Sequence, residues 1–230
     1  MEKLKGFCPQ LWQEVDVLRS GFVRPCCLFQ GTLYATKTEK FSVHNLSLEQ
    51  LSATPHLKML KRQALAGELI PQCDRCYNIE EKGGTSRRQL KIDRAKQSDP
   101  GGSATDFVRR IGNVSQTAEV MLQLGNQCNF RCRMCKPADS SKIEADAVHC
   151  AALQHLTDKL YFGHIGRNQG DWFGDEKIMF ARVYPAIAGA TTISLVGGEP
   201  LLIPMTRRFL QRLVDDGCAG QKDLVITTNG

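Results

Sequence analysis

The chain has 230 residues, with 30 Lys and Arg against 24 Asp and Glu, and a net charge of +6. A hydrophobic content of 42% and a charged content of 23% are ordinary for a globular protein. No apolar run approaches the roughly 18 residues of a membrane span, so we expect no membrane association. The basic residues are scattered and form no dense stripe with interleaved aromatics, so we expect no nucleic-acid surface either.

The cysteine content points to a compartment. The N-terminal residues Met1 to Gly6 lack the apolar segment of a signal peptide. Ten cysteines without an export signal favour a reducing interior and metal ligation over a disulfide framework. We therefore expect a cytoplasmic protein.

Short elements are predicted in the first third of the chain. Apolar residues at 12–17 and 22–23 flank a turn at Arg19-Ser20-Gly21, which predicts a β-hairpin. Three helix starts follow: Ser47 with Gln50 at the capping-box position, Thr54-Pro55 with a helix to about Ala66, and Cys73 with a short helix stopped at Gly83-Gly84.

Four cysteines of this region can surround one metal centre: Cys8, Cys26, Cys73 and Cys76. A C-x-x-C at a helix start lets backbone N–H groups face the thiolates. Neighbouring residues in an extended segment point to opposite faces, so only one of Cys26 and Cys27 is expected to be a ligand. From residue chemistry alone, a structural zinc site fits nearly as well as an iron–sulfur cluster.

A polar stretch at 96–103, rich in Gly and Pro, is the best candidate for a linker. We therefore divide the chain into an N-terminal part at 1–96, a linker at 97–115 and a C-terminal part at 116–230.

A second cysteine group opens the C-terminal part. Cys128, Cys132 and Cys135 form a C-x-x-x-C-x-x-C run directly after a predicted strand at 120–124. Zinc or a fully ligated cubane needs four protein ligands. Three thiolates on one loop can instead hold three irons of a four-iron cluster and leave the fourth iron open to a small molecule. The alternative is a zinc knuckle whose fourth ligand is remote.

Strands and helices then alternate. Asp139 and Ser140 can cap a helix with core-facing Ile143, Ala147, Ala151 and Leu160; an irregular segment at 162–172, a helix at 175–187, a strand at 192–196, a helix at 206–216 and a strand at 224–227 follow. This order implies a parallel sheet with right-handed crossovers, which binds ligands beyond its carboxyl edge. Gly197-Gly198-Glu199-Pro200 lies at that edge, where glycines let a backbone approach a ligand and Glu199 can accept a hydrogen bond.

These motifs resemble the radical S-adenosylmethionine (SAM) superfamily. The run 128–135 looks like its cluster loop, 197–200 like its SAM amino-group motif, and 225–230 like the end of its third barrel strand. The resemblance implies a [4Fe–4S] cluster on Cys128, Cys132 and Cys135, and reductive cleavage of SAM to a 5′-deoxyadenosyl radical. It implies SAM contacts from these residues: Gly197, Gly198, Glu199, Asn229 and Met134, the last replacing an aromatic residue near the adenine.

The N-terminal group resembles the twitch half of the SPASM/twitch auxiliary-cluster domain, through Phe7-Cys8-Pro9, Trp12, Gly21, Cys26 and Cys73-x-x-Cys76. The resemblance selects Cys26 over Cys27. It implies a second [4Fe–4S] cluster on Cys8, Cys26, Cys73 and Cys76, a peptide or protein substrate, and a reductant such as a flavodoxin or ferredoxin.

The fold class expected is therefore α/β: a partial radical SAM (β/α) barrel with parallel strands, preceded by a small α+β, cysteine-rich, twitch-like domain. Because the sequence reaches Gly230 just after the third strand, we expect the N-terminal part of a longer barrel, or one that another chain completes. The competing function is a non-catalytic iron–sulfur or zinc-binding module for interaction or electron transfer.

Overall fold

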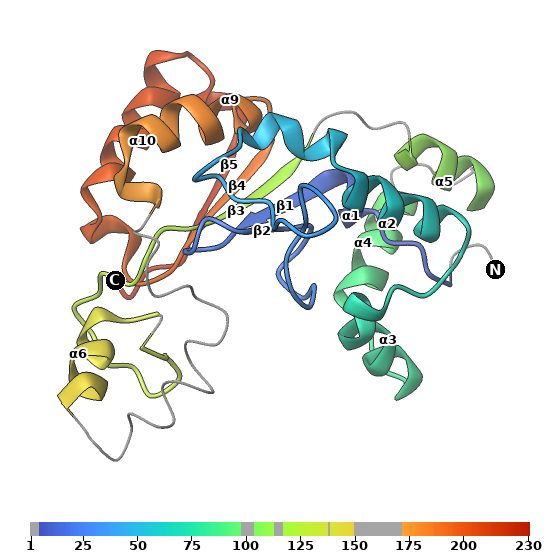
Figure 1. Cartoon of the computed structure of the whole chain (residues 1–230), viewed down its shortest axis with the longest axis horizontal. Coiled ribbons are helices and arrows are strands. Elements are labelled where there is room, and N and C mark those ends of the chain that lie inside the picture. The colour runs from blue at the N-terminus through green and yellow to red at the C-terminus, as the bar shows by residue number, and fades with distance from the viewer. Residues whose placement is uncertain (1–4, 98–103, 113–116, 138, 150–171) are drawn as a thin grey trace.

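A five-stranded sheet forms the centre of the molecule (Figure 1). The computed structural model describes residues 5–97, 104–112, 117–137, 139–149 and 172–230. The strands are β1 (Glu14–Val17), β2 (Val23–Arg24), β3 (Glu119–Gln123), β4 (Thr192–Val196) and β5 (Asp223–Ile226). Their order in the sheet is β2-β1-β3-β4-β5.

Four of these strands run parallel. β1 pairs with β3, β3 with β4 and β4 with β5 in parallel register, whereas β2 pairs antiparallel with β1 at one edge. The α/β class and the parallel pairing of the last three strands are thus confirmed. Such a sheet is compatible with part of a radical SAM barrel.

The predicted hairpin is present, and it joins the main sheet. Gly21 has a φ of 78°, the left-handed conformation that the turn between β1 and β2 requires. Trp12 lies in the short helix α1 before β1, not in the strand itself. β1 pairs with β3 over four residues, so the sheet runs across the division expected between the two parts of the chain. That division stays a prediction.

The stretch expected to be a linker contains a helix. Residues 98–103 and 113–115 of it lie outside the described residues, and between them is α5 (Ala104–Gly112). Phe107 and Ile111, four residues apart, are both buried, and the Phe107 ring stands edge-on to Phe7 at 5.7 Å. This spacing places two apolar side chains on one face of a helix, which docks it onto the N-terminal segment.

Helices are present at each predicted position, and the structure adds others. Before β3 they are α1 (Gln10–Gln13), the 3₁₀ turn η2 (Leu48–Ala53), α2 (Pro55–Leu65), the 3₁₀ turn η3 (Pro71–Cys73), α3 (Asp74–Glu81) and α4 (Arg87–Gln97). After β3 they are α6 (Ser141–His149), η5 (Trp172–Gly174), α8 (Glu176–Ile178), the π-helical η6 (Met179–Val183), α9 (Tyr184–Ile187), η7 (Pro200–Leu202), α10 (Pro204–Asp215) and η8 (Ala219–Gln221). Of these, α1, α4, η5, η7 and η8 were not predicted.

Local signals set several of these boundaries. The Ser47 N–H donates to Gln50 Oε1 at 3.0 Å, as a capping box requires, although the helix that follows is 3₁₀. Asp175 Oδ1 accepts from the N–H groups of Lys177 and Ile178 at 2.8 and 3.2 Å and so begins α8. The predicted segment at 162–171 and the core positions Ala151 and Leu160 lie outside the described residues.

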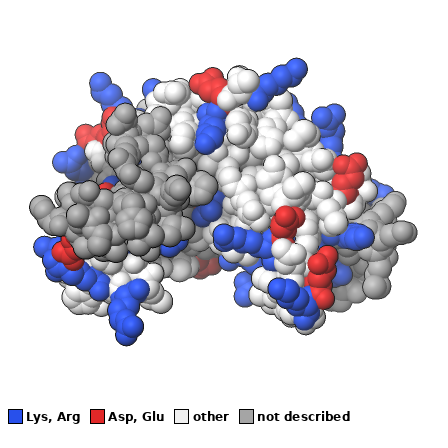
Figure 2. All heavy atoms as spheres, turned by 60° about the horizontal axis from the view of Figure 1, so that its bottom comes forward, with Lys and Arg blue, Asp and Glu red and all other residues white. Residues whose placement is uncertain are grey.

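The core lies against one face of the sheet. Val120 and Leu122 of β3 and Ile193 and Leu195 of β4 alternate with half-buried residues and belong to one apolar cluster. Helices α9 and α10, whose Ile187 and Phe209 join that cluster, lie on one side of the sheet in Figure 1. No helix within the described ranges is both long and apolar enough to cross a bilayer. On the face in Figure 2, basic and acidic side chains are interspersed.

Candidate functional site

Three chain segments meet where the parallel strands end. β3 leads to the cysteine loop, β4 to Gly197-Gly198-Glu199, and β5 to Thr228 and Asn229. Because Gln123 is level with Val196, and Leu195 with Ile226, all three segments leave the same edge of the sheet. In Figure 1 the cysteine loop and α6 lie beyond this edge, near the C-terminus.

Direct contacts tie the three segments together. The Glu199 N–H donates to the Gln127 carbonyl at 2.8 Å. The Asn229 amide nitrogen lies 3.8 Å from Cys128 Sγ and donates to Asn129 Oδ1 at 3.0 Å. The strand ends that the sequence motifs occupy are therefore in contact, and not merely on the same side of the sheet.

The two glycines lie against the backbone of the cysteine loop. Gly197 and Gly198 have φ values of 94° and 53°. A Cβ on Gly198 would lie 2.4 Å from the Gln127 carbonyl oxygen, and one on Gly197 would lie 2.8 Å from that of Gly125. The sequence predicts close backbone approach here, and the described chain itself makes that approach.

The cysteine loop is braced by the start of α6. Ser140 Oγ donates to the Phe130 carbonyl at 2.8 Å, and the Cys128 N–H donates to Ser141 Oγ at 3.2 Å. Two neutral hydroxyls therefore fix a loop that has little regular structure of its own.

Exposure differs among the three cysteines. Cys128 is buried, Cys135 is half-buried and Cys132 is exposed. Partial burial raises the pKa of Cys135, and the neighbouring Cys132, Asp139 and Cys128 raise it further. The three thiols are thus close enough to influence one another. Met134 is 88% exposed, so its contact with an adenine stays a prediction.

Glu199 is a buried carboxylate with partners from its own chain. Oε2 accepts from the Asn229 N–H at 2.8 Å, and Oε1 accepts from the Thr228 hydroxyl at 2.9 Å and the Leu201 N–H at 3.3 Å. Burial raises the pKa of Glu199, but these hydrogen bonds outweigh it and hold the pKa below its ordinary value. A carboxylate has about four acceptor positions, so one remains for a further donor such as an ammonium group.

The structure also gathers the four N-terminal cysteines. Cys8 precedes α1, Cys26 follows β2, and Cys73 and Cys76 lie at the junction of η3 and α3. Burial raises the pKa of Cys8 well above its ordinary value, and the nearby Cys26, Cys73 and Cys76 add to the effect. Burial likewise raises the pKa of Cys26 and that of Cys73 to about 12.

Cys27 has a different environment from its neighbour Cys26. Burial raises the pKa of Cys27, and the charged groups next to it are Arg87, Glu14, Asp16 and Arg24. Cys27 also raises the pKa of the adjacent Cys26. The selection of Cys26 as the member of the four-thiol group stays a prediction.

The thiols of the cysteine loop are the type of donor that an iron–sulfur cluster takes. Within the described part of the chain, no three His, Cys, Asp or Glu side chains converge closely enough to hold one metal ion. A four-iron cluster distributes its thiolates over separate irons, so its ligands are spread more widely than the four ligands of zinc. Thiol groups from one short loop, next to a backbone with glycines, fit such a cluster.

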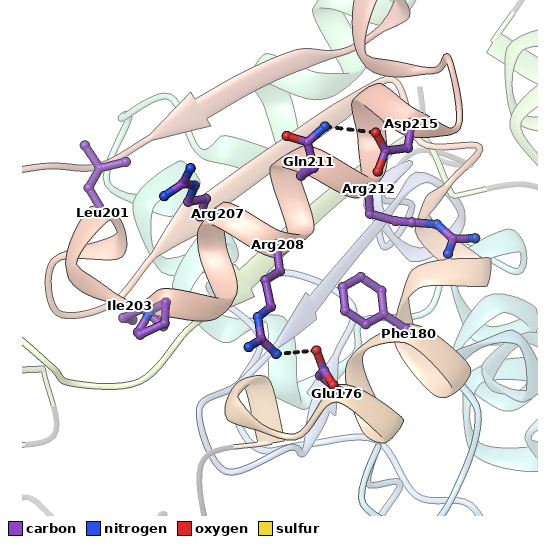
Figure 3. A pocket seen from close by; sticks show the side chains of 10 residues that line it. Glu176, Phe180, Leu201, Ile203, Arg207, Arg208, Gln211, Arg212 and Asp215 are labelled. Carbon is purple, nitrogen blue, oxygen red and sulfur yellow. Dashed lines mark hydrogen bonds and ion pairs between the residues drawn. The ribbon is translucent and has the colours of Figure 1, made fainter.

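A cavity among the described residues lies elsewhere. It has a volume of about 800 Å³ and lies beside α10, lined by Phe180, Leu201, Ile203, Arg207, Arg208 and Arg212 among others (Figure 3). Arg208 pairs with Glu176 and Arg212 with Asp216, so much of its charge is neutralised locally. None of its lining residues is a predicted cofactor residue.

Two supporting residues carry no motif signal of their own: Gln127 and Ser141. Each forms a hydrogen bond to a motif residue, and only the adjacency of Gln127 to Cys128 in the chain hints at it. Thr228 lies inside the motif at 225–230, but the sequence does not indicate its hydrogen bond to Glu199.

Comparison with known proteins gives one group of relatives. The chain is 31% identical over 131 residues to GTP 3′,8-cyclase from Xanthomonas campestris pv. campestris strains B100 and 8004. The match covers 57% of this chain and 32% of the relative, so the chain spans about a third of the length of the curated relatives it matches. This distant similarity supports the radical SAM superfamily. It also implies the [4Fe–4S] cluster and SAM as cofactors of such an enzyme. No family model and no solved structure matches the chain.

Proposed function

We propose that this chain is a radical SAM enzyme, or the N-terminal part of one, with Cys128, Cys132 and Cys135 holding the reactive [4Fe–4S] cluster. The observation that carries the proposal is the contact of Asn229 and Glu199 with the cysteine loop. When bound, the cluster and SAM supply the reductive cleavage that starts radical chemistry.

The chain's own residues have separate roles in this proposal. The glycines at 197 and 198 let their backbone pack closely against the cysteine loop, which places their peptide groups beside the proposed cluster site. Glu199 offers its remaining acceptor position to the SAM ammonium, and Asn229 positions Cys128. The exposure of Cys132 and Met134 leaves the loop open to SAM.

The test is anaerobic reconstitution of the 230-residue chain with iron and sulfide, followed by dithionite and SAM. We expect about four irons at this site and release of 5′-deoxyadenosine. Cys132→Ser removes a proposed cluster ligand. Its matched control is Cys218→Ser, which alters a half-buried cysteine outside both groups. A bound cluster without 5′-deoxyadenosine would favour the alternative, a non-catalytic electron-transfer module. Zinc without labile sulfide would reject the cluster.

We also propose that Cys8, Cys26, Cys73 and Cys76 bind a second [4Fe–4S] cluster in a twitch-like domain, supported by the mutual proximity of these thiols. We propose a flavodoxin or ferredoxin as the electron donor.

The twitch resemblance favours a peptide or protein substrate, whereas the name of the relatives points to GTP. Consumption of GTP during SAM turnover would decide for a nucleotide, and unchanged GTP would favour the peptide.

A further inference from the structure

The sheet has a polar face opposite its core. On β1, β3 and β4, apolar residues that face the core alternate with a second set: Glu14, Asp16, Glu119, Met121, Gln123, Thr192, Ser194 and Val196. Parallel strands usually carry apolar residues on both faces, because helices cover both. A polar face on such a sheet therefore needs an explanation.

A charged cluster occupies one end of this face. Arg24 of β2 is level with Asp16 of β1, and Arg24 Nε donates to Asp16 Oδ2 at 2.6 Å. The Gln123 amide of β3 donates to both Asp16 oxygens, at 3.2 and 3.3 Å. The Asp16 side chain is fully buried and that of Arg24 is 21% exposed. Burying such a pair is costly, so stability alone is a weak reason for it.

Most of the donors of Arg24 are unused. A guanidinium carries five N–H donors, and within the described residues only Nε has an acceptor. The two terminal nitrogens therefore present a fork of donors, held in orientation by Asp16. A fork of this shape matches a carboxylate or phosphate, which it binds with two parallel hydrogen bonds.

The cluster is also connected along the chain to both cysteine groups. Asp16 and Gln123 are near the carboxyl ends of β1 and β3, and β3 continues into the loop of Cys128. On the other side, Arg24 and Asp16 are charged neighbours of Cys27, which follows Cys26 directly. A molecule held at Arg24 would thus be close to the site edge of the sheet, where ligands of parallel sheets bind.

We propose that the Arg24 fork binds an anionic group, carboxylate or phosphate, of the substrate. This inference rests on the proposed function and adds to it a chemical class of substrate.

The experiment is calorimetric titration of the anaerobically reconstituted chain with two probes, inorganic tripolyphosphate and glutarate, which separate the phosphate from the carboxylate source. We expect one probe to bind with a Kd of about a millimolar or tighter. Arg24→Gln should weaken that binding at least about tenfold, and Arg24→Lys, which keeps the charge but not the fork, should weaken it less. The matched control is Lys91→Gln, because Lys91 pairs with Glu119 at the opposite end of the same face.

Two results would overturn the inference: no binding of either probe by the wild-type chain, or equal weakening by Arg24→Gln and Lys91→Gln. Arg24→Lys covers the case in which Arg24→Gln does not fold. Iron content and SAM cleavage by the wild-type chain are measured in parallel. If the wild-type chain cleaves SAM but binds neither probe, only this inference is wrong. If it binds a probe but holds no iron, only the proposed function is wrong.

Discussion

Gly198→Ala tests whether the diglycine turn and the cysteine loop form one unit. An alanine at 198 meets two costs. The left-handed backbone, at φ 53°, costs about 1 kcal/mol for a residue with a Cβ. The new Cβ would also lie 2.4 Å from the Gln127 carbonyl oxygen, and crowding of this kind adds about 1–3 kcal/mol.

Gly217→Ala separates these two costs. Gly217, after α10, has a φ of 68°, and nothing lies within 4 Å of a Cβ built on it. An alanine at 217 therefore has the cost of the left-handed backbone without the crowding of its Cβ. For a chain of this size, about 1 kcal/mol lowers the Tm by roughly 2–4 °C. We expect that shift for Gly217→Ala, and for Gly198→Ala a shift of roughly 4–16 °C from about 2–4 kcal/mol.

The functional consequence should be larger than the change in stability. To restore ordinary contact, the Gln127 carbonyl must move by about 1 Å, which disturbs the Glu199 hydrogen bond and the loop of Cys128. A displacement of that size costs about a hundredfold in rate when it misplaces reacting groups. The assay is 5′-deoxyadenosine formation at a temperature where both variants are folded. Equal Tm shifts, or wild-type rates in Gly198→Ala, would refute the reasoning.

Three further changes probe other parts of the structure. The depressed pKa of Glu199 contributes stability that is present above the ordinary carboxyl pKa and is lost as the pH falls through the folded pKa. Glu199→Gln should therefore flatten the pH dependence of the Tm below about pH 4.5. An unchanged pH profile would contradict this. Cys26→Ser should lower the iron bound after reconstitution while Cys27→Ser leaves it unchanged; equal iron contents would argue against the four-thiol group. Trp172→Ala empties a fully buried site and removes the hydrogen bond to the Leu18 carbonyl. It should lower the free energy of unfolding by about 3–5 kcal/mol, measured by denaturant titration. A loss below about 1 kcal/mol would show that the site collapses around the smaller side chain.

Local signals predicted several boundaries because their causes are local. The turn at Gly21, the capping box of Ser47 and the Asp175 cap each depend on neighbours within a few residues. The strand at Thr192–Val196 was predicted over its full length from its β-branched residues. The location of the three motifs at one edge of the sheet was also predicted from the sequence, because parallel strands end at the same edge.

The pairing of β1 with β3 could not be predicted in this way. More than 100 residues separate the two strands, and the alternating pattern of β1 fits a solvated hairpin as well as the edge of a larger sheet. For the same reason no local pattern marks Asp16, because its partners Arg24 and Gln123 come together only when β1 joins β3. Phe107 and Ile111 had the spacing of a buried helix face, but the Gly- and Pro-rich residues before them favoured a linker.

The two cysteine groups differ in the way that their proposed roles require. Cys8, Cys26 and Cys76 are buried beside the core, where exclusion of water shields a cluster and shifts its potential. Cys132, by contrast, is exposed on a loop held at its base by Ser141 and at its side by Asn229. A cluster that must admit SAM needs a rigid support and one open side, and a cluster that only transfers electrons or anchors a substrate needs no opening of that kind.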